Sequence, residues 1–99
     1  MRLHARTLKE VRIAPRLEAG SREAFSEETV SYRGAVLPRG GNLSYTPGGV
    51  ADGEELLLIL PGKAAVSVGD GAWVDGRLYV AQRVERWPWQ VEVVVAARD

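Results

Sequence analysis

The sequence predicts an all-β protein, a small antiparallel β-barrel or meander of about six or seven strands with a long Gly-rich loop. Two observations between residues 64 and 97 carry this prediction. Apolar runs are separated there by Asp75-Gly76, a strong hairpin signal, and by the break at Trp87-Pro88-Trp89. Both connections are far too short for a parallel crossover, so the strands that they join must run antiparallel.

Composition limits the class of protein and of function. A chain of 99 residues with 45% hydrophobic residues is typical of a single globular domain. Its 13 basic and 13 acidic residues cancel, so the total charge indicates neither a nucleic-acid nor a membrane partner. Without cysteine there is no thiol nucleophile, thiolate metal site or disulfide, which fits a reducing compartment.

The longest apolar run, 56–60, is too short to span a bilayer, and residues 1–6 lack the apolar run of a signal peptide. We therefore expect a soluble protein made in the cytoplasm.

The N-terminal part is expected to be a flexible basic arm, residues 1–8, followed by a first strand. The strand is predicted from about Lys9 to Leu17, because Val11 and Ile13 alternate with charged positions. Pro15 places this strand at an edge or breaks it, since proline has no backbone donor. The arm could contact phosphates or could simply be solvated, given the basic residues of this part of the chain: Arg2, Arg6, Lys9, Arg12 and Arg16.

A second strand is predicted after a polar connection. Residues 18–28 are expected to form a turn or a long hairpin connection. The strand covers 30–37, with Val30, Tyr32 and Val36 on one face. Gly34 interrupts it and indicates a bulge or a bend at a barrel corner.

A mobile loop is predicted for residues 38–53, because glycine and proline recur there too densely for regular structure. Loops of this length in compact domains are usually functional or disordered. Leu43, Tyr45 and Val50 are candidate contacts for a partner. The alternative is that they attach the loop to the barrel wall.

The third strand follows the loop and ends at Pro61-Gly62. Residues 56–60 are all Leu or Ile, which predicts a strand that is covered on both faces. A short helix is the weaker alternative, because Gly53 and Pro61 bracket the segment. If one face is bare in the monomer, it becomes an association surface or an aggregation hazard.

The last two strands predict a β-bulge. Val91, Val93 and Val95 alternate with Glu92 and Val94, so the first three share one face of the strand. In the preceding strand Tyr79 and Ala81 share one face, whereas Val84 falls on the other. A bulge at Gln82-Arg83 would restore the register, and a small barrel needs such a device to turn its corners.

No residue set for catalysis, a metal or a cofactor is evident, so we expect no enzyme and no small-molecule substrate. The only histidine, His4, lies in the basic arm. Asp70 and Asp75 occupy turn positions, where a short side chain caps its own backbone. This structural role already explains why aspartate occurs there. The chain contains no H-E-x-x-H, G-x-S-x-G or Walker pattern. It also has too few ligand residues for zinc.

Two large aromatic residues at a predicted hairpin tip form the remaining candidate site. Trp87 and Trp89 lie close in sequence to Arg83 and Arg86. Aromatic side chains beside arginines can stack nucleic-acid bases, as in single-strand binders. They can also be the buried contacts of a protein interface. A third option is that one indole covers the end of the barrel while the other is half exposed.

The C-terminal half carries turn and strand residues that form one pattern: Pro61-Gly62, Val68-Gly69-Asp70, Trp73-Val74, Gly76-Arg77-Leu78-Tyr79 and Val84. This pattern resembles that of the small head–tail completion proteins of tailed phages and prophages, also called minor capsid, head closure or stopper proteins. The resemblance covers most of the chain from about Lys9 and departs from the family pattern at Ala81, where a larger apolar residue is usual.

This resemblance implies a structural component of the head–tail connector. Its partners would be portal, adaptor and tail proteins and further copies of itself in a ring, close to packaged DNA. Each barrel would contact its neighbour through an edge strand or through the face of 56–60. The ring would close the DNA channel, and the protein would pass from the bacterial cytoplasm to the head–tail junction of the virion. A small nucleic-acid-binding barrel that uses the tryptophans and arginines of the hairpin tip is the alternative.

Overall fold

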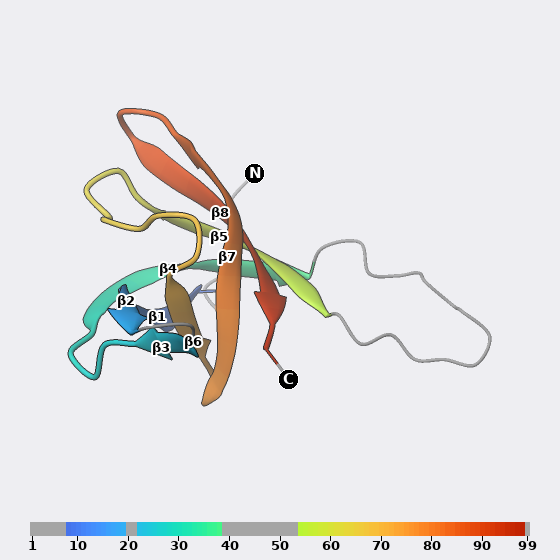
Figure 1. The fold of residues 1–99 in the computed structure, drawn as a ribbon. Coiled ribbons are helices and arrows are strands. Elements are labelled where there is room, and N and C mark those ends of the chain that lie inside the picture. Colours follow the sequence, from blue (N-terminus) through green and yellow to red (C-terminus); the bar gives the residue numbers. More distant parts are fainter. Residues whose placement is uncertain (1–7, 20–21, 39–53, 99) are drawn as a thin grey trace.

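The computed structural model describes residues 8–19, 22–38 and 54–98, which form a closed antiparallel β-barrel and a small separate sheet (Figure 1). No helix occurs in these ranges, so the all-β prediction is confirmed. The basic arm up to residue 7, including His4, and residues 39–53 of the predicted loop, with Leu43, Tyr45 and Val50, lie outside the described residues. The strands are β1 (Leu8–Ala14), β2 (Arg16–Ala19), β3 (Arg22–Phe25), β4 (Val30–Pro38), β5 (Glu55–Pro61), β6 (Gly71–Val74), β7 (Arg77–Arg86) and β8 (Gln90–Ala97).

The barrel follows the order β1-β4-β5-β8-β7-β6, and β6 pairs again with β1 to close it. Every pairing is antiparallel. Each barrel strand therefore has a hydrogen-bonded neighbour on both sides along part of its length. Closure of this kind removes the free edges on which open sheets associate. Contacts through the barrel wall must then use side-chain faces, whereas the separate β2–β3 sheet keeps its own edges.

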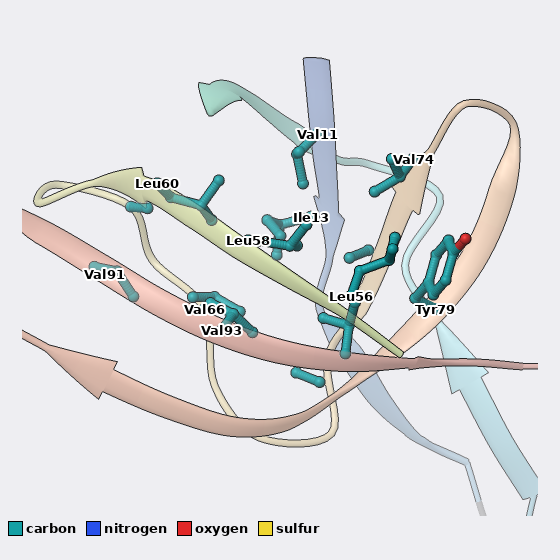
Figure 2. Close-up of a cluster of buried hydrophobic side chains, with 14 residues drawn as sticks. Val11, Ile13, Leu56, Leu58, Leu60, Val66, Val74, Tyr79, Val91 and Val93 are labelled. Carbon is teal, nitrogen blue, oxygen red and sulfur yellow. The ribbon is translucent and has the colours of Figure 1, made fainter. Parts of the chain in front are cut away.

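The core fills the barrel with the inward-facing side chains of alternate strand positions (Figure 2). Leu58 of β5 and Val91 and Val95 of β8 are completely buried. No polar or charged residue is buried in the described part of the chain. The cluster consists of Val11, Ile13, Leu56, Leu58, Leu60, Ala64, Val66, Ala72, Val74, Tyr79, Ala81, Val91, Val93 and Val95.

The prediction that β5 is covered on both faces is wrong. Burial alternates along the strand, so that Leu56, Leu58 and Leu60 are buried while Leu57 and Ile59 are only half-buried. The reason is that the described structure is a single-walled barrel, in which the outer face of a strand has no second layer above it. The run of apolar residues therefore supplies both a core face and a partly exposed outer face.

Pro15 breaks the first predicted strand into β1 and β2. β2 pairs with β3 as a short hairpin, so part of the segment predicted as a turn or a long hairpin connection forms strands of its own. Leu17 is 46% exposed and does not continue the buried face of Val11 and Ile13. The backbone N–H of Ser26 donates to the Pro15 carbonyl at 2.8 Å, which closes the base of the hairpin.

Gly34 marks a close approach between strands rather than a bulge. The β1–β4 register continues without a shift through Gly34, which lies opposite Lys9. A Cβ atom at this position would collide with the Ile59 carbonyl oxygen of β5. Glycine is required where two backbones come this close.

The hairpin turn and the bulge are both confirmed. Asp75 and Gly76 have φ angles of 54° and 81°, the positive pair that defines a type I′ turn. The register of β7 on β8 shifts between Ala81 and Arg83. The shift turns Val84 toward the core, against which it packs.

The connection 62–70 closes one end of the barrel. Ala64 and Val66 are buried in the core although they belong to no strand. The Tyr32 hydroxyl accepts a hydrogen bond from the Ala65 backbone N–H at 3.0 Å. The yellow-to-gold segment in Figure 1 therefore contributes two side chains to the core, while Lys63, Ala65, Ser67 and Val68 are exposed.

Candidate protein-interaction site

The β7–β8 hairpin ends in a tight turn that displays both tryptophans of the candidate site. The Trp87 N–H donates to the Gln90 carbonyl at 2.8 Å, and the Gln90 N–H donates to the Trp87 carbonyl at 3.3 Å. Pro88 and Trp89 are the central residues of this turn. Proline suits the first central position because its ring fixes φ near the required value.

The neighbouring turn of the chain supports this tip. A Cβ atom at Gly62 would collide with the Pro88 carbonyl oxygen, so the two backbones lie against each other. The side chains remain accessible, since Trp87 is 37% and Trp89 is 68% exposed. Rigid, exposed indoles of this kind bury a large area on binding at a small cost in conformational entropy.

Arg86 holds the connection 62–70 in place. Its Nη1 donates to the Ala64 carbonyl and its Nη2 to the Val66 carbonyl, each at 3.0 Å. Arg86 lies opposite Val91, a residue of the inward face. Two of its donors are therefore engaged with the backbone, and a role in partner binding would compete with this internal one.

Arg83 lies on the other face of β7. It is paired with Val94, which belongs to the outward series of β8. Its Nη2 is 3.5 Å from the Glu85 Oε2, and 64% of its side chain is exposed. The two arginines thus point to opposite faces of one strand and do not form a common basic patch beside the tryptophans.

Arg83 belongs instead to a shallow groove on the outer face of β5, β8 and β7. The groove is lined by Leu57, Arg83, Glu85, Glu92 and Val94. Glu85 and Glu92 are direct cross-strand partners. Like charges in this position repel each other, so the pair costs stability in the monomer. Glu92 accepts a hydrogen bond from the Gln90 Nε2 at 2.8 Å.

An apolar strip continues from this groove across the barrel wall. Leu37 of β4, Leu57 of β5 and Val94 of β8 are consecutive cross-strand neighbours. All three are half-buried, and so is Ile59, which lies one position further along the outer face of β5. The outer face of β5 is thus incompletely covered, the condition under which the sequence predicts either an association surface or an aggregation hazard.

Sequence reasoning missed this groove because the pairing of the glutamates depends on where the turn is centred. Once Trp87 and Gln90 are fixed as the ends of the turn, Glu85 and Glu92 are equally distant from its centre. That symmetry is readable in the sequence, and it would have placed the two carboxylates side by side.

The Tyr79 phenol lies beside charged groups that act on its pKa in opposite directions. Burial, and then the nearby Glu54 carboxylate, raises the pKa of Tyr79, while the Arg77 guanidinium opposes that rise. The Arg77 guanidinium lies 5.6 Å from the centre of the Tyr79 ring and also pairs with Glu54 at 2.7 Å. This cluster links the residue before β5 to the beginning of β7.

The aspartate that precedes β6 has a structural role. Its Oδ1 accepts from the Arg16 N–H at 3.1 Å and its Oδ2 accepts from the Ser67 N–H at 2.8 Å, so Asp70 joins the barrel to the β2–β3 hairpin. Within the described ranges no cluster of His, Cys, Asp and Glu could hold a metal ion. In the same part of the chain there is no helix that is long and apolar enough to cross a membrane.

Comparison with known proteins gives a structural likeness without a sequence match. No family model and no curated protein matches the sequence. Among solved structures, the phage-like element PBSX protein xkdH from Bacillus subtilis superposes with a TM-score of 0.58 at 14% sequence identity. The likeness covers 93% of this chain and 94% of that chain. The two proteins therefore share a fold over almost their whole length.

Proposed function

We propose that this protein is a structural component of a phage or prophage particle that acts at the head–tail connector. One observation carries the proposal: the barrel is similar over nearly its full length to a protein of a phage-like element. The motifs of the C-terminal half, which resemble head–tail completion proteins, support the same assignment independently of the superposition.

The mechanism is assembly rather than catalysis. Copies of the barrel form a ring on the portal or adaptor and help to close the DNA channel until the tail docks. A closed barrel suits this task, because it is a rigid body whose outer face and hairpin tip are available for contacts. Trp87 and Trp89 are the side chains best placed to enter pockets on the adaptor or the tail protein.

The nucleic-acid alternative has less support. It requires a basic surface beside the tryptophans, whereas Arg86 is engaged with the backbone and Arg83 faces away toward Glu85. Phosphate contacts would give an affinity that falls steeply with salt. We therefore expect a flat tryptophan-fluorescence titration with single-stranded DNA at low salt, and a salt-dependent signal would favour the alternative.

Co-purification with a tagged portal–adaptor complex from the same genome tests the assembly proposal. The wild-type chain is expected to be retained with the complex, and the double variant Trp87→Ala/Trp89→Ala to lose at least about tenfold in affinity, since interface tryptophans often contribute 2 kcal/mol or more. Val30→Ala is the matched control, because it removes an exposed apolar side chain elsewhere on the barrel. Failure of the wild-type chain to bind any portal, adaptor or tail protein would refute the proposal.

A further inference from the structure

Within the described residues, the groove on β5, β8 and β7 is lined by two carboxylates, Glu85 and Glu92, and by one cation, Arg83, so its charges sum to a negative value. Glu92 lies between Ile59 on one side and Glu85 on the other, so neither neighbouring strand places a cation beside it. The cation that lines the groove in the described part of the chain, Arg83, approaches Glu85 at 3.5 Å. The floor of the groove, Leu57 and Val94, is apolar and half-buried. A partner that fits this surface presents a cation together with an apolar or aromatic side chain.

The opposite wall of the same barrel has those features. Arg12 of β1 is the cross-strand partner of Trp73 on β6, and both belong to a second shallow groove on the outer face. Glu10, Asp75 and Gly76 also line this groove, and the Asp75 carboxylate is paired with Lys9 at 2.7 Å. Arg33 of β4 lies opposite Glu10, whose carboxylate accepts from the Ser31 hydroxyl at 3.0 Å. Within the described residues neither Arg12 nor Arg33 makes an ion pair.

The two surfaces lie on opposite sides of the molecule. In the closed order β1-β4-β5-β8-β7-β6, two strands separate β1 from β8 in either direction. A contact between these two different patches of identical chains is heterologous, because each copy uses one patch on one neighbour and the other patch on the next. Contacts of this type repeat from copy to copy and close into a ring when the rotation allows it.

We propose that the β5–β8–β7 face of one copy docks on the β6–β1–β4 face of the next, with Glu85 and Glu92 opposite Arg12 and Arg33. Trp73 then packs on the apolar floor formed by Leu57 and Val94. The occupant is a second copy because one chain carries both complementary patches and its formal net charge is zero, so that copies do not repel one another. The inference rests on the proposed function in that it assigns the faces that form the ring.

Charge reversal tests this docking with the purified chain alone. In sedimentation velocity over a concentration series, the wild-type chain is expected to self-associate with a Kd between about 10 µM and 1 mM, more weakly as salt increases. Glu85→Lys/Glu92→Lys and Arg12→Glu/Arg33→Glu should each weaken self-association by about tenfold or more. An equimolar mixture of these two variants should restore association, because each supplies the face that the other has lost.

The control variant is Glu27→Lys/Glu28→Lys, which makes the same change of charge in the exposed connection between β3 and β4. It should associate like the wild-type chain, and circular dichroism should show all variants folded. A wild-type chain that stays monomeric up to about 1 mM would overturn the inference. So would variants that associate unchanged, a mixture that stays monomeric, or loss of adaptor binding with intact self-association in Glu85→Lys/Glu92→Lys.

These outcomes are separable from those of the proposed function. Self-association is measured without any phage protein, whereas the function is tested by retention on the portal–adaptor complex. A chain that binds the complex but never itself would refute the docking faces alone. A chain that associates through these faces but binds no phage protein would refute the function alone.

Discussion

Replacement of Arg86 by alanine should destabilise the barrel far more than replacement of Arg83, although the two arginines lie three positions apart on one strand. Arg86 donates two hydrogen bonds at 3.0 Å to the carbonyls of Ala64 and Val66, whose side chains are buried. Arg83 makes one long ion pair at 3.5 Å from a largely exposed position. The comparison separates an arginine that holds the core together from one on the surface.

The expected magnitudes follow from these contacts. A hydrogen bond from a charged donor is worth about 1.5–3 kcal/mol, and the two of Arg86 are coupled, so we expect Arg86→Ala to cost about 2–4 kcal/mol. An exposed ion pair contributes about 0–1 kcal/mol, so Arg83→Ala should cost less than about 1 kcal/mol. Against a total stability of about 5–15 kcal/mol, the first change is large and the second is small.

Urea unfolding followed by circular dichroism measures both free energies of unfolding. Hydrogen exchange at Ala65, whose N–H is bonded to the Tyr32 hydroxyl, reports on the connection itself and should accelerate in Arg86→Ala. Arg86→Lys should recover only part of the loss, since an ammonium group cannot reproduce the planar fork of two donors. Equal destabilisation by Arg86→Ala and Arg83→Ala would refute the conclusion that Arg86 holds the connection 62–70 in the core.

Further predictions concern the core, the turn and the titration of a tyrosine. Leu58→Ala, at a fully buried position, should cost about 2–5 kcal/mol in urea unfolding, and a cost below about 1 kcal/mol would contradict its place in the core. Gly76→Ala should cost about 1 kcal/mol, because its φ of 81° strains a residue with a side chain; an unchanged or raised melting temperature would argue against the type I′ turn. Because the pKa of Tyr79 is raised in the folded state, the fold favours the neutral phenol, and its contribution is complete below the ordinary pKa and lost as pH rises through the raised value. Thermal melts should therefore show an alkaline loss of stability that is reduced in Tyr79→Phe, and parallel pH profiles for the two proteins would show this explanation to be wrong.

The features that the sequence predicted depend on interactions between residues close in the chain. Asp75-Gly76 determines its own turn, since both φ angles are positive and few residues other than Gly, Asn and Asp tolerate that. The bulge at Gln82-Arg83 was predicted because Tyr79, Ala81 and Val84 cannot all face the core from a regular strand. The register of β7 on β8 confirms it. For the turn and for the bulge, the residues of one short segment were therefore enough to predict the local backbone structure.

The features that it missed depend on contacts between residues distant in sequence. Ala64 and Val66 lie outside the strands, and the backbone that places them in the core is held by hydrogen bonds from Arg86 and to Tyr32, both distant in sequence. The outer face of β5 could not be predicted as partly bare, since a run of Leu and Ile does not reveal whether a second layer covers it. The contact residues expected at Leu43, Tyr45 and Val50 lie outside the described residues and stay a prediction.

Electron cryo-microscopy of the chain bound to its portal–adaptor complex would test most sharply whether this barrel is a connector component. We expect a ring of barrels at the channel exit, with Trp89 of each copy inserted into an adjacent protein. A portal–adaptor complex that carries no density for the barrel, although the chain was present at saturating concentration, would contradict the proposed function.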